Sequence, residues 1–153
     1  MDIPEFDPGE FTFLSDPELL IKKRRIQDKV FKLLKLTLES IKTVVDPSDF
    51  KHFPEGKISR GENYRDLPYL VLDYPAVFSM DDIFACRTMF LWGNFYSATI
   101  HLQGMYLDQN REILATLANQ LNPKDLYISA GATPWHYHYE PDNYQPLNYI
   151  SLE

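Results

Sequence analysis

Apolar residues recur at steps of three and four positions along one long stretch near the N-terminus. No glycine or proline interrupts this spacing between Pro17 and Asp46, a pattern typical of one face of an α-helix. Ser15 and Glu18 fit a capping box at its start, and Pro17 lies in the first turn, where its missing N–H costs nothing. We therefore predict a helix over residues 15–45. Its apolar face consists of Ile26, Val30, Leu33, Leu34, Leu38, Ile41, Val44 and Val45.

The predicted helix is longer than the body of a molecule of this size. At about 1.5 Å per residue it would extend for about 45 Å. A compact chain of 153 residues is only about 40 Å across. We therefore expect its first turns, which contain Lys22–Arg25, either to extend beyond the body or to be separated from the rest of the helix by a kink. An extended end would offer an arm for a homodimer or for another protein partner.

The hydrophobic period changes to two in the segment CRTMFLWGNFYSATIHLQG, which begins at Cys86. Runs of β-branched and aromatic residues flank Gly93-Asn94, and glycine at the first central position suits a type II′ hairpin turn. That turn would place Trp92 opposite Phe95 on an exposed face that mixes aromatic and polar residues, while helices cover the almost wholly apolar opposite face. The predicted exposed face consists of Cys86, Thr88, Phe90, Trp92, Phe95, Ser97, Thr99, His101 and Gln103.

Shorter patterns give the remaining elements. Residues 69–73 are typical of a strand, and residues 126–130 and 135–140 are typical of a pair of antiparallel strands. A second helix is predicted over 108–121, because Asp108 is a good N-cap for the apolar face that follows. Residues 79–82 fit a single helical turn.

These elements predict an α+β protein with a mainly antiparallel sheet of about five strands and two helices packed on one face. With 44% hydrophobic residues, a chain of 153 residues can build one core and is short for two, so we expect a single domain over residues 1–153. The sheet and the second helix occupy residues 67–140. Segments without a sustained period are predicted to form an N-terminal arm over 1–14, an irregular loop over 46–66 and an irregular tail over 141–153.

Composition indicates the cellular compartment and argues against two classes of partner, membranes and nucleic acids. The single cysteine, Cys86, cannot form an internal disulfide, and the N-terminal residues lack the basic flank and apolar run of a secretory signal, so we expect a cytoplasmic protein. The longest apolar stretches have only a few residues, whereas about 20 are needed to cross a bilayer, so no membrane partner is expected. The formal charge of −7 argues against nucleic acid as a partner.

Acidic and basic residues are segregated along the chain. Six acids and no bases precede Lys22, and four acids and no bases follow Lys124. The bases concentrate in the first half of the predicted helix, where they would form either a docking stripe for an acidic partner or RNA, or a solvated helix face. This stripe consists of Lys22, Lys23, Arg24, Arg25, Lys29 and Lys32.

The segment WHYHYEPDNY alternates two histidines with a carboxylate. If residues 135–140 form a strand, His136, His138 and Glu140 lie on one face, as metal ligands require. Neighbouring positions on that face are about 6.6–7 Å apart, a spacing that strains a third ligand in the row. His101, on another strand, is therefore the better third ligand for a divalent metal such as zinc. Otherwise the histidines belong to a groove in which the neighbouring tyrosines pack.

The segment SRGENYR concentrates hydrogen-bond donors, which would recognise a carboxylate or phosphate if they folded over the exposed hairpin face. We therefore predict a small binding module for a small anionic ligand or a protein partner, without a cofactor. The alternative is a metal-dependent enzyme using His136, His138 and His101. Common catalytic signatures are missing, and Cys86 opposite His101 is the remaining nucleophile to consider. The predicted ligand-binding residues are Arg60, Asn63, Tyr64, Arg65, Trp92, His101, His136 and His138.

Overall fold

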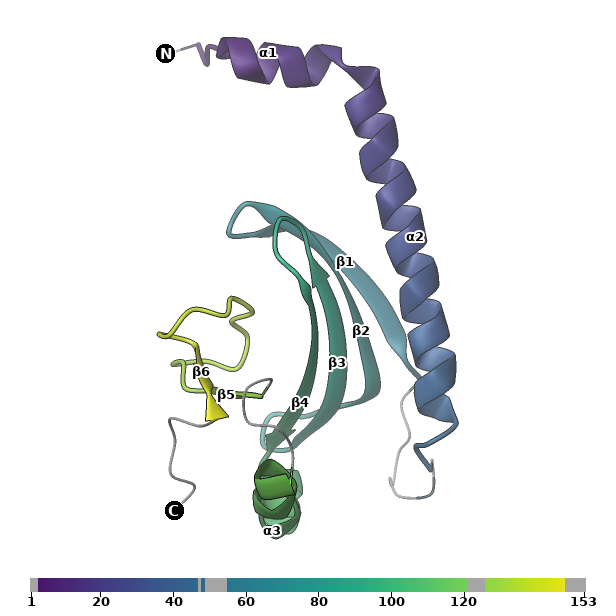
Figure 1. Cartoon of the computed structure of the whole chain (residues 1–153), viewed down its shortest axis with the longest axis vertical. Helices are drawn as coiled ribbons and strands as arrows, with labels where there is room; N and C mark the ends of the chain where they lie inside the picture. Colours follow the sequence, from purple (N-terminus) through teal and green to yellow (C-terminus); the bar gives the residue numbers. More distant parts are fainter. Residues whose placement is uncertain (1–2, 47, 49–54, 121–125, 148–153) are drawn as a thin grey trace. The chain divides into compact units, whose positions relative to one another are not determined.

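The computed structural model describes residues 3–46, 48, 55–120 and 126–147 (Figure 1). It combines helices with antiparallel strands, which confirms the predicted α+β class. The elements in chain order are α1 (Pro8–Ser15), α2 (Pro17–Lys42), β1 (Lys57–Tyr64), β2 (Leu67–Phe78), β3 (Ile83–Leu91), β4 (Tyr96–Gln103), α3 (Met105–Gln120), β5 (Tyr127–Ser129) and β6 (Tyr144–Pro146).

The strands form two sheets. The larger sheet has the order β1-β2-β3-β4, so each strand pairs with its neighbour in the sequence. The strands β5 and β6 form an antiparallel sheet of their own, instead of completing the single sheet of about five strands that the sequence predicts. Within the described part of the chain, no helix is both long enough and apolar enough to cross a membrane. The chain groups into two compact units, the first made of Met1–Ala76 with Cys86–Thr99 and the second of Val77–Ala85 with Ile100–Glu153.

The core of the first unit lies between α2 and the sheet. Val30 and Leu34 of α2 are buried in one cluster with Leu70, Leu72 and Tyr74 of β2. Because successive strand residues point to opposite faces, these alternate residues of β2 identify the face that α2 covers. The predicted helix stripe is therefore confirmed except at Leu33 and Val44, which are exposed. The cluster is completed by the partly buried residues Ile26, Leu38, Ile41, Val45, Ile58 and Phe90.

Strand β1 corrects the prediction of an irregular loop over residues 46–66. Lys57–Tyr64 pairs antiparallel with β2, and the last residue of β1 pairs with Leu67 across a two-residue turn. Both turn residues, Arg65 and Asp66, have positive φ angles, of 51° and 62°, as a type I′ turn requires. The pattern conceals this hairpin because Arg-Asp is not the usual asparagine-glycine signal for such a turn. Residues 47 and 49–54 of the predicted loop lie outside the described residues.

Two helices replace the predicted arm and the start of the long helix. The Asp7 carboxylate accepts the N–H of Glu10, and the Glu10 carboxylate accepts the N–H of Asp7, which together form a capping box for α1. The predicted capping pair of Ser15 and Glu18 is wrong, because Ser15 ends α1 and the Asp16 carboxylate caps α2. Asp16 has an extended backbone (φ −101°, ψ 94°), so the chain changes direction between the helices (Figure 1).

Strand β2 is longer than the predicted strand over 69–73. It continues through a cis peptide bond between Tyr74 and Pro75 and ends at Phe78. The predicted helical turn over 79–82 is a tight loop instead. The Ser79 N–H donates to the Asp82 carbonyl (3.0 Å), and the Asp82 N–H donates to the Ser79 hydroxyl (2.9 Å).

The second helix starts earlier than predicted, and the last strand lies elsewhere. The Asp82 carboxylate accepts the N–H of Met105 (2.8 Å), the first residue of α3, so this helix begins three positions before Asp108. The predicted strand over 135–140 is irregular. The strand that returns to β5 is Tyr144–Pro146, within the segment predicted to be an irregular tail.

The hairpin of β3 and β4 confirms the predicted pairing but not its register. The Leu91 N–H donates to the Phe95 carbonyl (3.2 Å), so the loop has three residues, with Gly93 (φ 72°) in the middle. This is a shift of one residue, and it places the Phe90 ring against Tyr96, with ring centroids 4.8 Å apart. Because Phe90 also packs against the core under α2, the face predicted to be exposed is covered at this position.

Candidate functional site

In the second unit, candidate chemistry lies on the loop between β5 and β6. Asn143 is fully buried and holds this loop together. Its Nδ2 donates to the His138 carbonyl (2.8 Å), and its N–H donates to the Glu140 carbonyl (2.9 Å). Its own carbonyl accepts the N–H groups of Ala130 (2.8 Å) and Gly131 (3.2 Å). The backbone that carries His138 and Glu140 is therefore fixed by a buried hydrogen-bond network.

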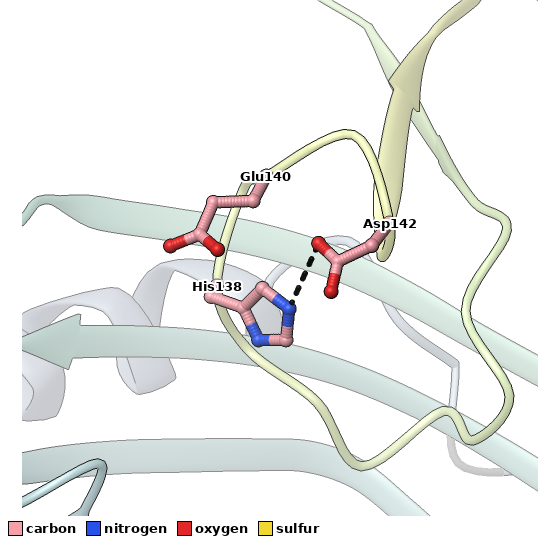
Figure 2. Close-up of side chains that lie close together, drawn as sticks. All are labelled: His138, Glu140 and Asp142. Carbon is pink, nitrogen blue, oxygen red and sulfur yellow. Dashed lines mark ion pairs between the residues drawn. The ribbon is translucent and has the colours of Figure 1, made fainter.

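His138, Glu140 and Asp142 converge from this loop (Figure 2), and one ligand atom of each lies within 4.8 Å of the others. His138 is only 7% exposed, and its Nε2 lies 3.4 Å from Asp142 Oδ1, whereas both carboxylate residues are exposed. One imidazole nitrogen and two carboxylate oxygens suit zinc or another divalent transition metal. With three protein ligands, a further coordination position would be left for water or a substrate.

This cluster differs from the histidine set predicted from the sequence. Among the described residues, it is the group of three ligand side chains that approach closely, and it contains neither His101 nor His136. The His136 ring lies beside that of His138, with centroids 5.4 Å apart, and His101 packs edge-on against Trp135 at 5.3 Å. Glu140 joins the cluster because its segment is irregular, so the strand spacing that argued against this residue does not apply.

Tyrosines position the same loop from the two-stranded sheet. The Tyr139 ring stacks on that of Tyr144 of β6, with centroids 4.4 Å apart and an interplanar angle of 8°. It also meets Tyr127 of β5 edge-on at 5.2 Å. Tyr139 follows His138 directly, so this aromatic packing fixes the chain between two members of the cluster.

In the first unit, most of the predicted ligand residues lie at one end of the sheet. Arg60 lies on β1 opposite Leu70, and Arg65 lies in the turn between β1 and β2. The Trp92 N–H donates to the Pro68 carbonyl (3.1 Å), so the turn between β3 and β4 lies beside the start of β2. We call this end the sheet tip (Figure 1). It holds Asn63, Tyr64, Arg65 and Trp92, whereas the three predicted histidines belong to the second unit.

Trp92 carries a buried polar atom at the sheet tip. Its ring lies edge-on to Phe90, with centroids 5.6 Å apart. The indole Nε1 is buried and has no hydrogen-bond acceptor among the described residues. A buried donor without an acceptor is destabilising by about 1–3 kcal/mol.

Cys86 lacks the properties of a catalytic nucleophile. The thiol is partly buried, and desolvation raises its pKa, which disfavours the reactive thiolate at neutral pH. The structure therefore gives no support to thiol chemistry at this position.

The N-terminal helices present an uncovered apolar surface. Helix α1 has no buried residue, and Figure 1 shows it, with the first turns of α2, beyond the strands of the same unit. We call residues 3–25 the helical arm. Its apolar residues are 39–83% exposed. They are Ile3, Phe6, Phe11, Phe13, Leu14, Leu19, Leu20 and Ile21.

The arm is exposed because α2 is longer than the sheet it covers. Leu19 lies seven residues before Ile26 and continues the same helix stripe, yet it is 39% exposed, whereas Val30 is 3% exposed. An ion pair between Lys23 and Glu62 of β1 (3.2 Å) lies at the sheet tip, where this stripe loses its cover. The helix is continuous from Pro17 to Lys42 and extends past the sheet of the first unit before its basic turns, whereas Lys23 of those turns, predicted to extend beyond the body, contacts β1.

Comparisons of the chain with models of protein families, with curated proteins and with solved structures gave no significant match. Function is therefore inferred from the chemistry of the arm, the sheet tip and the cluster.

Two parts of these sites escape sequence reasoning. Asp142 lies in the segment predicted to be an irregular tail, and a turn after Glu140 brings it back to His138. Helix α1 lies in the predicted irregular arm. A signal for it exists in Asp7-Pro8-Gly9-Glu10, which has capping-box spacing and a proline at the first helical position.

Proposed function

We propose that this protein is a protein-interaction module and that the helical arm is its docking surface. The exposure of the arm's eight apolar residues carries this proposal. Taking about 180 Å² for each fully exposed side chain, they present roughly 800 Å². This total is spread around the sides of α1 and the start of α2 and does not form one patch, but even the largest apolar patch on a typical monomer measures only about 300–600 Å², so this much apolar exposure on one segment favours an interaction site.

The charges around the arm favour a protein over a membrane surface as the partner. Six acids and no bases precede Lys22, so the apolar residues of α1 are surrounded by negative charge. The cytoplasmic surface of a membrane is also negative and would repel this segment. Bases follow directly, from Lys22 to Arg25. A protein surface can match an apolar centre between acidic and basic regions.

The sheet tip lies where α2 extends past the sheet, and we propose that it adds polar recognition to the arm. Arg60 and Arg65 are exposed and offer guanidinium groups, which suit carboxylate or phosphate. These residues would bind an anionic group, carried either by the protein partner or by a small ligand.

Photocrosslinking from the arm tests the proposed docking surface. The photoreactive residue p-benzoylphenylalanine would replace Phe11, which is 59% exposed, in the full chain produced in its native cells. Irradiation should give a discrete protein adduct. The matched control places the same group at Met80, which is 91% exposed and lies outside the arm. Adducts absent at position 11, or equally abundant from both positions, would show that the arm is not a docking surface.

The His138, Glu140 and Asp142 cluster favours divalent-cation binding as a second candidate function. The close approach of three ligand atoms on a loop held by the buried Asn143 supports it. A metal bound there would also be the basis for the alternative of a metal-dependent enzyme, since three protein ligands leave a coordination position for substrate.

Calorimetric titration of the purified chain with Zn²⁺ tests this second candidate. The double substitution Glu140→Gln and Asp142→Asn keeps the side-chain shapes but removes both charges, and it should weaken binding at least tenfold. His136→Ala is the matched control, because His136 lies beside the cluster without belonging to it. If Zn²⁺ binds no tighter than about 100 µM, or binds the double variant equally well, cation binding at this cluster is excluded.

A further inference from the structure

We infer that the partner of the helical arm is a second copy of this chain, an inference that rests on the proposed docking function of the arm. The arm and the helix that follows carry two blocks of opposite charge. Six acids and no bases precede Lys22, and seven bases with one acid lie between Lys22 and Lys35. Two copies in antiparallel contact would bring the acidic block of each against the basic block of the other.

The basic block has charges available for such a contact. Among the described residues, two of its bases form ion pairs, Lys23 with Glu62 and Arg24 with Asp28. Its remaining bases are exposed on α2, and only one acid, Asp28, lies within the block. Like charges repel along the helix, so an acidic partner segment would relieve this repulsion. Within the part of the chain that the structure describes, the bases of this block outside these two ion pairs are Lys22, Arg25, Lys29, Lys32 and Lys35.

Two-fold symmetry makes the charge pattern self-complementary. In an isologous interface, each contact between a segment and its counterpart occurs twice. With the two-fold axis close to the junction of α1 and α2 at Asp16, the apolar residues of both arms would face one another, with acid-to-base contacts on either side. One chain therefore carries both halves of such a contact, a segment of mixed acidic and apolar residues before Lys22 and the basic block after it, so no second protein is needed to complement it.

The area of the arm agrees with this partner. A stable interface of standard size buries about 800 Å² on each side. The apolar residues of the arm expose roughly that area on all sides of its helices, so a partner would cover part of it and contacts with the charged blocks would supply the rest. The share of aromatic residues among these apolar residues is high, with Phe6, Phe11 and Phe13 each at least half exposed. Aromatic residues are enriched in the well-packed centres of interfaces. The arm thus has the size and composition of one half of a dimer interface.

Sedimentation equilibrium of the purified full chain tests the inference. Between about 1 and 100 µM the wild type should sediment as a dimer, with twice the 17.9 kDa mass of the chain. Phe11→Ser with Phe13→Ser should sediment as a monomer. Leu117→Ser is the matched control, because Leu117 is 42% exposed on α3, outside the arm, and it should leave the dimer unchanged.

Charge reversal distinguishes a second copy from other partners. Glu5→Lys with Glu18→Lys, and separately Lys22→Glu with Arg25→Glu, should each raise the dimer dissociation constant at least tenfold. An equimolar mixture of the two variants should restore dimers, because each arm then meets a complementary arm. These positions avoid the capping residues Asp7, Glu10 and Asp16. Because Glu18 lies in the first turn of α2, circular dichroism of each variant should show wild-type helix content before its dimer dissociation constant is compared.

The outcomes separate this inference from the proposed function. A monomeric wild type at 100 µM, or a mixture of charge variants that stays monomeric, overturns the second copy as partner. If the photoreactive residue at position 11 still forms a discrete adduct with a different protein, the docking function stands while self-association fails. If position 11 forms no adduct and the chain is monomeric, both are overturned.

Discussion

Replacement of Leu34 by alanine should remove a central contact between α2 and the sheet. Leu34 is 1% exposed and is buried in the cluster with Val30, Leu70 and Leu72. Buried leucine-to-alanine substitutions are destabilising by about 2–5 kcal/mol, because apolar contacts are lost and a cavity remains. Leu34 is enclosed by helix residues and strand residues together, so the site cannot collapse easily, and we expect a loss of about 3–4 kcal/mol.

Urea denaturation followed by circular dichroism would measure this loss as a change in the free energy of unfolding. The measurement needs one fixed protein concentration, since self-association would add a concentration-dependent term. Leu36→Ala is the matched control on the same helix, because Leu36 is 66% exposed, and its effect should stay within about 0.5 kcal/mol. Equal effects of the two substitutions would refute the packing of this face of α2 on the sheet.

Three further predictions follow from particular contacts. Arg87 donates two hydrogen bonds to the Asp73 carboxylate (2.7 and 3.0 Å) in a largely buried pair, so Asp73→Asn should lower the free energy of unfolding by about 2 kcal/mol. The control, Asp108→Asn in the exposed pair with Arg111, should lower it by at most about 1 kcal/mol. Equal losses for the two variants in urea titrations would contradict this prediction. Asp66→Gly should raise the midpoint of thermal unfolding, because glycine adopts the positive φ of 62° without strain, and a lower midpoint would argue against the type I′ turn. Burial raises the pKa of the Cys86 thiol, so at pH 8 this thiol should react with an aromatic disulfide more slowly than free cysteine does. The reaction should accelerate as the pH rises. A rate equal to that of free cysteine would contradict the burial of Cys86.

Long periodic segments could be predicted from the sequence because their pattern is redundant. The stripe of α2 repeats over several turns, so errors at its ends do not change the face that packs on the sheet. The α+β class follows from the same redundancy in the strands. Helix ends are less redundant. At the start of α2, Ser15 and Asp16 are both good capping residues one position apart, and the choice between them depends on where α1 ends.

Strand register could not be predicted because one residue decides it. Gly93-Asn94 fits a two-residue turn, yet the three-residue loop also places Gly93 at a position of positive φ. The two alternatives differ by one residue, which moves every following side chain to the other face. Phe90 lies before the turn, so its position depends instead on which face of the sheet α2 covers, and it packs under α2 and not on an exposed groove. The aromatic residues predicted to form a ligand face therefore belong in part to the core.

The candidate cation site depends on contacts that no local pattern contains. Glu140 and Asp142 reach His138 only because the buried Asn143 bonds the backbone on both sides of the loop. A Cβ at Gly131 would collide with the Asn143 Oδ1, so the loop also depends on a glycine twelve positions away. Alternating histidines lie on one face only if the segment is a strand, so in an irregular segment their spacing does not predict which side chains meet.

The shortness of α1 links its stability to its proposed role. Helix α1 has eight residues, whereas isolated helices below about 12–15 residues are marginal in water because nucleation is unfavourable. Its capping box stabilises it by only about 1 kcal/mol, and no residue of α1 is buried against the rest of the described chain. The phenylalanines of α1 are therefore the remaining source of stabilisation, and they can act only by packing against another surface. A second copy would supply that surface, so docking and completion of the helix would be one coupled step.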